Sequence, residues 1–515
     1  MAMPEADRHL RVAIDWEVDA LDPPASFGGW NTGRVAHQIF ESLVEDDLSL
    51  QGRAPTQLVP ALAERIDVSA DGLLYTFHLR QGVQFHDGTA FDAAAVVYNL
   101  RRVWDKSFAG YSPIAASYNQ VAMQSVASVD AIESHAVRVT LREPFAEFLR
   151  YMTQEDSPGS LAFLSPAALA VHGHGNAADQ AAGTGPFMID QRIKTTAGSG
   201  IRVRRNPDYW GGAPWLETIT FIPMPAAEDR AAALIEGRVD LAYGAAPEKL
   251  DALHDAGFVV HEGDVPYVWY IAFNMRDGAT TSLAVRQAVA HAVNKSALAS
   301  LFGSATRATA GILPPASPSH DPAFPEPYPH DPARARQLLA SEGLSGGFEM
   351  EIIAARAGSG QLDPVMIYGR IAEDLAAVGI RVTTRFHDDW VSYCEEWQGG
   401  MPRGIGASEM SWGMSADVWL EQVLHSRYRS PIGFNTGHYS SKELDDVLDS
   451  ARREQIEPRR IELYRAANRL VAEQLPVLPL LTIRRGLVVH SKRVKNFRFA
   501  SQNWHDLRNV TLDGQ

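Results

Sequence analysis

Two histidine motifs contain residue types that catalysis or metal binding would need. His172 and His174 lie two residues apart and could place two imidazoles near one metal ion, while His86 and Asp87 could act as an acid–base pair. No carboxylate or thiol lies directly beside His172 and His174, so an exposed polar loop is the better interpretation. The glycine that follows Asp87 favours a turn in which the carboxylate caps the backbone.

Other signatures of enzyme sites are absent from the sequence. It contains no G-x-x-x-x-G-K-[ST], H-E-x-x-H, C-x-x-C or G-x-S-x-G motif. The single cysteine, Cys394, excludes an internal disulfide framework and a cluster of thiolate ligands. The net charge of −15 argues against a nucleic-acid partner, because such proteins need a basic surface. We therefore expect no catalytic residue, no cofactor and no metal site.

Aromatic rings and glycines occur together at residues 27–31, directly after the first predicted strand. Loops at the carboxyl ends of strands bind ligands in α/β proteins, so a ring there could stack on a solute. The alternative is burial of the tryptophan in the core. The expected ligand-binding residues in this segment are Phe27, Gly28, Trp30 and Asn31. Arg356 follows a predicted strand over 348–355 and could bind a carboxylate or phosphate, or could equally be an ordinary surface residue.

The elements that position these residues can be predicted from periodicity and capping. Residues 74–79 alternate in polarity as a half-buried strand does, a second short strand is predicted at 83–85, and Asp92 can cap a helix over 93–103. Asp331-Pro332 and Asp363-Pro364 each predict the start of a helix.

The second half of the chain shows a strand–helix–strand order. The helix that starts at Asp363 lies between strands predicted at 348–355 and 380–386, so these strands should pair in parallel. One helix over 284–301, a proline-rich loop over 310–332 and an apolar strand over 477–489 are also predicted. Alternating strands and helices over the whole length indicate the α/β class.

Several short blocks of the chain resemble one family in the same order. They are LYTFHLRQGVQFHDGTAFDAAAVVYNLRRV at 74–103, Leu21-Asp22-Pro23 with 39–43, 60–64, Gly-Thr-Gly-Pro-Phe at 183–187, Arg-Asn-Pro-Asp-Tyr-Trp at 205–210, Phe273-Asn274 with 285–288, and 433–440. These blocks are similar to those of the extracytoplasmic solute receptors of dipeptide, oligopeptide and nickel ABC importers, the family 5 solute-binding proteins. The resemblance implies structural roles for 205–210 and for Asn274.

The resemblance also implies a fold and a domain order. It implies a periplasmic-binding-protein fold of two hinged lobes with an extra inserted domain. By position, lobe one would comprise 1–45, 184–265 and 482–515, the inserted domain 46–183, and lobe two 266–481. The hinge strands would lie near Tyr267–Phe273 and Leu480–Val489.

A further block, at 409–417, resembles the family's "gWgaDypDP" segment, in which the first aspartate pairs with the ammonium group of a peptide. Here Asp417 can be aligned with either family aspartate, and the proline-flanked half is missing. If Asp417 takes the later position, an ammonium would be buried unpaired, at a cost of several kcal/mol. The binding residues expected from this block are Ser411, Trp412, Gly413, Met414, Ser415 and Asp417, with Tyr111 and Tyr118 from the inserted domain.

The function that the resemblance implies is that of a monomeric periplasmic receptor, which closes around a small solute and delivers it to an ABC permease. The solute could be an oligopeptide, an opine or a sugar-phosphate conjugate; nickel is disfavoured because no histidine lies in the binding blocks. A hydrolase on a similar scaffold and a sensory receptor are the alternatives. The first residues lack the apolar stretch of a signal peptide, so we expect an exported protein whose leader is not contained in this sequence, with a cytoplasmic protein as the alternative.

Overall fold

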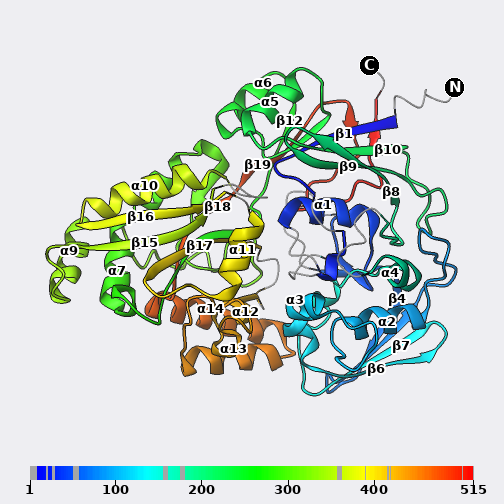
Figure 1. Cartoon of the computed structure of the whole chain (residues 1–515), viewed down its shortest axis with the longest axis horizontal. Coiled ribbons are helices and arrows are strands. Elements are labelled where there is room, and N and C mark those ends of the chain that lie inside the picture. Colours follow the sequence, from blue (N-terminus) through cyan, green and yellow to red (C-terminus); the bar gives the residue numbers. More distant parts are fainter. Residues whose placement is uncertain are drawn as a thin grey trace. The chain divides into compact units, whose positions relative to one another are not determined.

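The computed structural model describes residues 8–18, 21–25, 29–49, 57–154, 161–173, 180–356, 362–388, 390–413, 417, 419–500 and 503–513. The chain divides into two compact units (Figure 1). Unit 1 comprises Met1–Gly263 and Arg485–Gln515, and unit 2 comprises Asp264–Arg484. Both units combine sheets with helices, which confirms the predicted α/β class. In the described part of the chain, no helix is long and apolar enough to cross a membrane.

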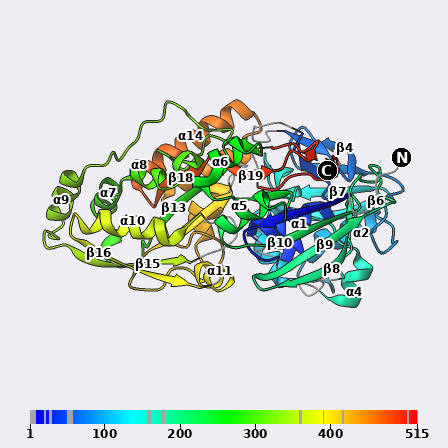
Figure 2. The same ribbon diagram turned by 90° about the horizontal axis from the view of Figure 1, so that it is seen from above.

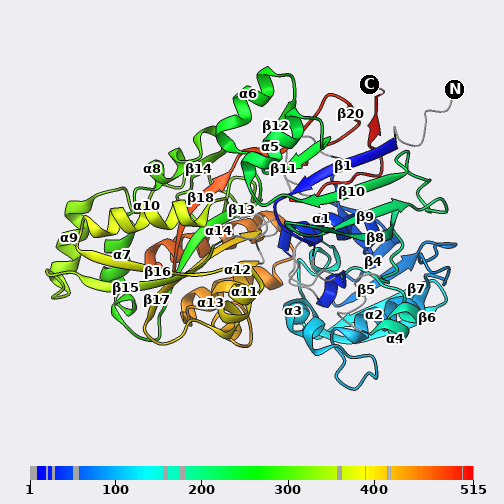
Figure 3. The same cartoon turned by 45° about the horizontal axis from the view of Figure 1, so that its top comes forward.

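Unit 1 contains a seven-stranded sheet with the order β12-β19-β11-β1-β10-β9-β8; Figure 3 labels all of these strands except β19, which is labelled in Figure 1. The strands are β1 (His9–Ile14), β8 (Phe187–Thr195), β9 (Gly198–Arg205), β10 (Thr218–Pro223), β11 (Leu241–Tyr243), β12 (Val259–Glu262) and β19 (Arg485–His490). The helices α1 (Gly29–Ile39), α5 (Ala227–Ile235) and α6 (Leu250–Asp255) belong to this part of the unit. The central strand β1 is fully buried over Val12–Ile14 and runs parallel to β10 and β11.

The same unit contains a separate four-stranded sheet with the order β4-β5-β7-β6. Its strands are β4 (Ala63–Val68), β5 (Leu74–Leu79), β6 (Val126–Glu133) and β7 (Ala136–Leu141), and the neighbouring helices are α2 (Ala93–Arg102), α3 (Pro113–Met123) and α4 (Pro166–His172). The predicted strand over 74–79 and the Asp92 cap are confirmed, since the Asp92 carboxylate accepts from the Ala95 amide at 2.9 Å.

The prediction of a short strand at 83–85 is wrong. This segment forms only an isolated bridge, between Gln84 and Ala90. The chain turns back at once, because the Gly88 amide donates to the Phe85 carbonyl and the Phe85 amide donates to the Thr89 carbonyl. Two further small pairs complete unit 1: β2 (Val44–Asp46) with β3 (Leu58–Pro60), and β20 (Val494–Lys495) with β21 (Thr511–Leu512).

Unit 2 is built on a six-stranded sheet with the order β14-β18-β13-β17-β15-β16. The strands are β13 (Tyr267–Phe273), β14 (Thr306–Ala308), β15 (Phe348–Ala355), β16 (Ile380–His387), β17 (Ile405–Gly413) and β18 (Val477–Ile483). The predicted parallel pairing of β15 with β16 is confirmed, and the connecting helix α10 (Pro364–Ala376) lies along β16 (Figure 2). Asp331 and Asp363 cap their helices as predicted.

The remaining helices of unit 2 are α7 (Leu283–Ala292), α8 (Lys295–Ser300), α9 (Pro332–Ser341), α11 (Trp390–Gly399), α12 (Trp419–Leu424), α13 (Lys442–Arg453) and α14 (Glu457–Gln474). The prediction of a single helix over 284–301 is wrong, because the segment forms two helices, α7 and α8. Val293 leaves the helical conformation, and the Asn294 side chain accepts from the Ala297 amide and starts a new helix. The loop predicted over 310–332 is confirmed over 310–331, which contains no helix or strand, while Pro332 is the first residue of α9.

The apolar strand predicted over 477–489 is two strands. It is interrupted at Arg484, where β18 of unit 2 ends and β19 of unit 1 follows. The chain enters unit 2 just before β13 and leaves it just after β18, so both predicted hinge strands lie beside a unit boundary. The three-domain scheme, with its inserted domain at 46–183, stays a prediction.

Candidate functional site

One edge of the unit 2 sheet collects the carboxyl ends of three strands. β15 runs parallel to both β16 and β17, so Ala355, His387 and Gly413 end their strands at the same edge. The first residue of β13, Tyr267, pairs with Gly413, and β18 runs antiparallel to β13, so both chain connections to unit 1 also leave from this edge. In α/β proteins, ligands bind at the carboxyl ends of strands. We therefore take this edge as the candidate site of unit 2.

The expected binding residues at the end of β17 are placed in part. Ser411 is buried and pairs with Trp269 of β13, and the backbone of Trp412 pairs with Val268. The side chain of Trp412, as well as Met414 and Ser415, lie outside the described residues. The structure thus brings the segment 411–413 to the candidate edge.

Asp417 is buried and both of its oxygens accept from serine hydroxyls. Oδ1 accepts from the Ser317 hydroxyl at 2.5 Å, and Oδ2 accepts from the Ser319 hydroxyl. Both serines belong to the proline-rich segment 310–331, which the sequence suggested only as a covering loop. No spacing in the sequence links them to Asp417. The contacts hold the carboxylate by neutral donors instead of presenting it to solvent.

Arg356 lies directly after β15 at the candidate edge. Its Nε donates to the Asp388 carboxylate at 3.1 Å, and its guanidinium lies 5.0 Å from the centroid of the Phe386 ring. The Arg356 side chain is 52% exposed and that of Asp388 is 90% exposed. Exposed ion pairs are worth about 0–1 kcal/mol, so a ligand carboxylate could replace Asp388 at little cost.

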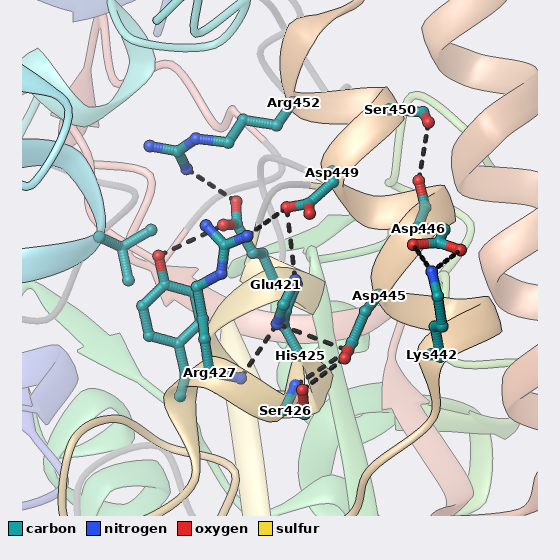
Figure 4. Close-up of polar contacts among 12 residues, drawn as sticks. Glu421, His425, Ser426, Arg427, Lys442, Asp445, Asp446, Asp449, Ser450 and Arg452 are labelled. Carbon is teal, nitrogen blue, oxygen red and sulfur yellow. Dashed lines mark hydrogen bonds and ion pairs between the residues drawn. The ribbon is translucent and has the colours of Figure 1, made fainter. Parts of the chain in front are cut away.

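Helix α12 follows Asp417, and it is held by a buried ion pair (Figure 4). All six residues of α12 are buried. Glu421 of this helix accepts from Nη1 of Arg452, on α13, at 2.8 Å, and the Tyr428 hydroxyl donates to the same carboxylate at 3.3 Å. The Leu420 amide donates to the Asp417 carbonyl at 3.1 Å, so the position of Asp417 depends on how α12 is anchored.

A second group of charged residues joins the end of α12 to α13 (Figure 4). His425 is buried between two aspartates, with Nδ1 at 3.4 Å from Asp445 and Nε2 at 3.3 Å from Asp449. Because Nδ1 accepts from the Arg427 amide at 3.1 Å, the proton of a neutral ring lies on Nε2, facing Asp449. Sequence analysis missed this group, since its members come from different elements of unit 2.

Glu409 lies on β17, two residues before Ser411. It is buried, and neither carboxyl oxygen has a hydrogen-bond partner among the described residues. Burial raises the pKa of this carboxyl from 4.5 to about 8. The groups near it are tyrosines, which include Tyr368 of α10 and Tyr393 of α11. Glu409 is therefore a neutral carboxylic acid at pH 7, next to the strand end that carries the expected site.

In unit 1, the segment after β1 that was expected to be a ligand-binding loop has a different structure. Gly29 to Asn31 form the first turn of α1 and are not a loop. Asn31 is fully buried: its Nδ2 donates to the Trp16 carbonyl at 3.1 Å and its Oδ1 accepts from Arg34 Nη1 at 2.7 Å. Arg34 also contacts Asp15 at 3.1 Å. Phe27, Gly28 and the side chain of Trp30 lie outside the described residues.

Tyr111 and Tyr118 are both partly exposed; Tyr111 precedes α3 and Tyr118 lies within it. The same helix packs on the short turn Pro23–Ala25, where Asn119 Nδ2 donates to the Pro24 carbonyl at 3.1 Å. Helix α1, which begins at Gly29, also packs on this turn. The binding roles of both tyrosines stay predictions.

The motifs interpreted as structural do have structural contacts. Tyr209 and Trp210 donate to the buried Glu41 carboxylate at 2.8 and 2.9 Å, and Asn274 Nδ2 donates to the Ile405 carbonyl at 2.8 Å. His86 is partly buried and hydrogen-bonded to the Gly185 carbonyl, and this burial lowers its pKa to about 4. Within the residues that the structure describes, no group of three histidine, cysteine or acidic side chains is arranged to hold a metal ion.

Comparison with known proteins identifies the class. Residues 57–429 match the bacterial extracellular solute-binding proteins, family 5. The glutathione-binding protein GsiB of Escherichia coli O1:K1 is 31% identical over 501 residues, which cover 96% of this chain and 92% of that protein. The chain belongs to the family 5 solute-binding proteins and is the substrate-binding receptor of an ABC importer. Members of the family are extracytoplasmic receptors and not enzymes.

Solved structures show the same fold. The periplasmic binding protein DppA from Helicobacter pylori, in complex with the peptide STSA, has a TM-score of 0.86 at 24% identity, with 98% of each chain covered. AgaA from A. tumefacien R10, in complex with agropinic acid, has a TM-score of 0.82 at 23% identity, with 98% of this chain and 99% of that chain covered. The expected family and fold are thus confirmed.

Proposed function

We propose that the solute is a short anionic peptide of the glutathione kind, bound mainly through its carboxylates. The observation that carries this proposal is the state of Asp417, both of whose oxygens accept from Ser317 and Ser319. A peptide ammonium would have to share this carboxylate with two hydroxyl donors. Arg356, by contrast, has one ion-pair partner in the described part of the chain, the exposed Asp388.

Glutathione fits this arrangement because it carries two carboxylates and one ammonium group at neutral pH. A charged hydrogen bond from an arginine to a carboxylate contributes about 1.5–3 kcal/mol. The relatives at 31% identity bear the name glutathione-binding protein, which supports the same class of solute. An opine is the second candidate, because a structural neighbour holds agropinic acid, whose acid group is an anion at neutral pH.

The remaining parts of the proposed function concern the protein as a whole. The receptor is exported to the periplasm, acts as a monomer, releases its solute unchanged and closes around it by a hinge between the units. Ligand binding shifts such an equilibrium because contacts to both lobes exist only in the closed form. The aromatic residues expected to cover the solute are Trp30, Tyr111, Tyr118 and Trp412.

Calorimetric titration of glutathione, a neutral dipeptide and agropinic acid tests the choice of solute. Arg356→Ala should weaken glutathione binding at least about tenfold, the equivalent of 1.4 kcal/mol. Arg381→Ala is the matched control, because Arg381 is an exposed arginine at the opposite end of β16 and should leave the affinity unchanged. Equal affinities of wild type and Arg356→Ala would refute the carboxylate role of Arg356.

A second variant tests the role assigned to Asp417. Ser317→Ala with Ser319→Ala removes both hydroxyl donors, so the carboxylate becomes available to an ammonium group. The double variant should bind the neutral dipeptide more tightly than wild type does. A dipeptide that already binds wild type tightly, with loss on Asp417→Asn, would show that Asp417 is the ammonium site after all. Mass spectrometry of the recovered solute separates a receptor from a hydrolase.

A further inference from the structure

Helix α13 presents three charged side chains to α12 and to the residues that follow it. Asp445, Asp449 and Arg452 occupy positions i, i+4 and i+7 of α13, a spacing that puts them on one side of the helix (Figure 4). Each of them has a polar partner in the segment 421–427. This side of α13 therefore holds α12 by directional polar contacts.

The contact between Glu421 and Arg452 is shielded from water. The two side chains are 2% and 1% exposed, and Nη1 of Arg452 donates to Oε2 of Glu421 at 2.8 Å. Removing two charges from water costs about as much free energy as their attraction returns, so apolar residues of similar volume would stabilise the fold equally well or better. What the ion pair adds is direction. It favours the one orientation of α12 in which the two groups meet, whereas apolar side chains can pack in several.

The residues that follow α12 are held by the other two carboxylates of α13. The Ser426 amide donates to Asp445 Oδ1 at 2.9 Å, and Nη2 of Arg427 donates to Asp449 Oδ1 at 2.6 Å. Helix α12 itself has six residues, and a helix of this length is not stable in isolation. Its orientation therefore depends on these contacts and on the buried ion pair.

Asp417 joins α12 to a second element of unit 2. Its carbonyl accepts from the Leu420 amide of α12, while its carboxylate accepts from the hydroxyls of Ser317 and Ser319. The serine segment is held in turn by α14, because Arg465 Nε donates to the Ser319 carbonyl at 3.3 Å. Both hydroxyl contacts of Asp417 consequently require α12 and α14 to keep their positions.

We propose that Glu421 and Arg452 are positioning residues that set the solute selectivity, because they hold Asp417 against Ser317 and Ser319. This inference rests on the proposed function, in which the Asp417 carboxylate is shared with two hydroxyl donors. Without the ion pair, α12 takes other orientations and the carboxylate separates from the serines. Asp417 then offers more of its lone pairs to a peptide ammonium. Selectivity for anionic solutes falls, although no expected solute contact has been replaced.

Calorimetric titration of the full-length receptor with glutathione and with the neutral dipeptide alanyl-alanine tests this role. Glu421→Leu combined with Arg452→Met should shift the ratio of the two affinities toward alanyl-alanine by at least about fivefold. Arg452→Lys keeps the ion pair and should leave the ratio within about twofold of wild type. A purely structural role would weaken the binding of both solutes by the same factor and leave the ratio unchanged.

Two further variants complete this experiment. Lys442→Ala, which removes an exposed ion pair of the same helix, is the matched control and should not change the ratio. If the double variant does not fold, Glu421→Gln combined with Arg452→Met replaces it. This pair of substitutions also removes both buried charges, and the amide keeps an acceptor for the Tyr428 hydroxyl.

Hydrogen–deuterium exchange of the unliganded receptor measures the cause without any solute. The double variant should exchange faster than wild type in the segments 315–321 and 419–428, and Arg452→Lys should exchange as wild type does. Unchanged exchange in both segments would overturn the proposal, as would faster exchange with an unchanged ratio of affinities. A wild type that binds alanyl-alanine more tightly than glutathione would refute the proposed solute. The exchange rates and the shift in the ratio would still decide the role of the ion pair.

Discussion

The buried Glu409 should make unit 2 less stable as pH rises, and Glu409→Gln should remove this effect. Its pKa is about 8 in the folded protein, against 4.5 for an ordinary glutamate, because burial disfavours the charged form. Between these two values the unfolded chain has lost the proton and the folded protein keeps it. Stability is therefore fully present below about pH 4.5 and is lost progressively as pH rises through 8.

The size of the effect follows from the shift in pKa. One pKa unit corresponds to 1.36 kcal/mol, so the free energy of unfolding should fall by about 3 kcal/mol between pH 4.5 and 7, and by about 5 kcal/mol in total above pH 8. The amide introduced by Glu409→Gln has nearly the same shape as the carboxyl group and carries no charge at any pH. The variant should match wild type near pH 4.5 and exceed it increasingly toward alkaline pH.

Urea denaturation at several pH values between 4.5 and 8.5, followed by tryptophan fluorescence, measures this difference. Glu349→Gln is the matched control, because Glu349 lies in the same sheet with an 81% exposed side chain and should show no pH-dependent difference from wild type. A constant difference between Glu409→Gln and wild type across the pH range would refute the reasoning. It would mean that the folded protein solvates or pairs the Glu409 carboxylate.

Two further predictions concern stability. His261 stacks on Phe499 at 5.1 Å, and burial lowers its pKa from 6.5 to about 3, so stability is lost as pH falls below 6.5. His261→Phe should therefore raise the free energy of unfolding at pH 5, measured by urea denaturation, by up to about 2 kcal/mol relative to wild type. A variant less stable than wild type at pH 5 would contradict this prediction. Arg452→Met leaves Glu421 buried without its ion-pair partner and should lower the free energy of unfolding by about 3–5 kcal/mol, whereas Arg452→Met combined with Glu421→Leu should recover most of this loss. Lys442→Ala, which removes an exposed ion pair, is the control and should leave the stability unchanged. Equal stabilities of the single Arg452→Met and the double variant would contradict this.

Local signals in the sequence predicted local structure well. Asp92, Asp331 and Asp363 cap their helices because a carboxylate needs only the amide three residues later, which the chain itself supplies. The parallel pair of β15 and β16 followed from the order of elements for a similar reason. Where a break depended on tertiary context, the prediction was wrong. The apolar run 477–489 continues through Arg484, but its two halves pair with strands of different units.

The candidate site was less predictable because residue type does not specify a partner. Three acidic residues within one short segment have three different environments. The carboxyl group of Glu409 has no hydrogen-bond partner among the described residues, Asp417 accepts from serines about 100 positions earlier, and Glu421 pairs with an arginine 31 positions later. The sequence order alone made Asp417 the counterpart of a family aspartate that binds an ammonium group. Its contacts indicate instead that a ligand ammonium would have to share the carboxylate with two hydroxyl donors, so the affinity for peptides depends on the loop that carries them.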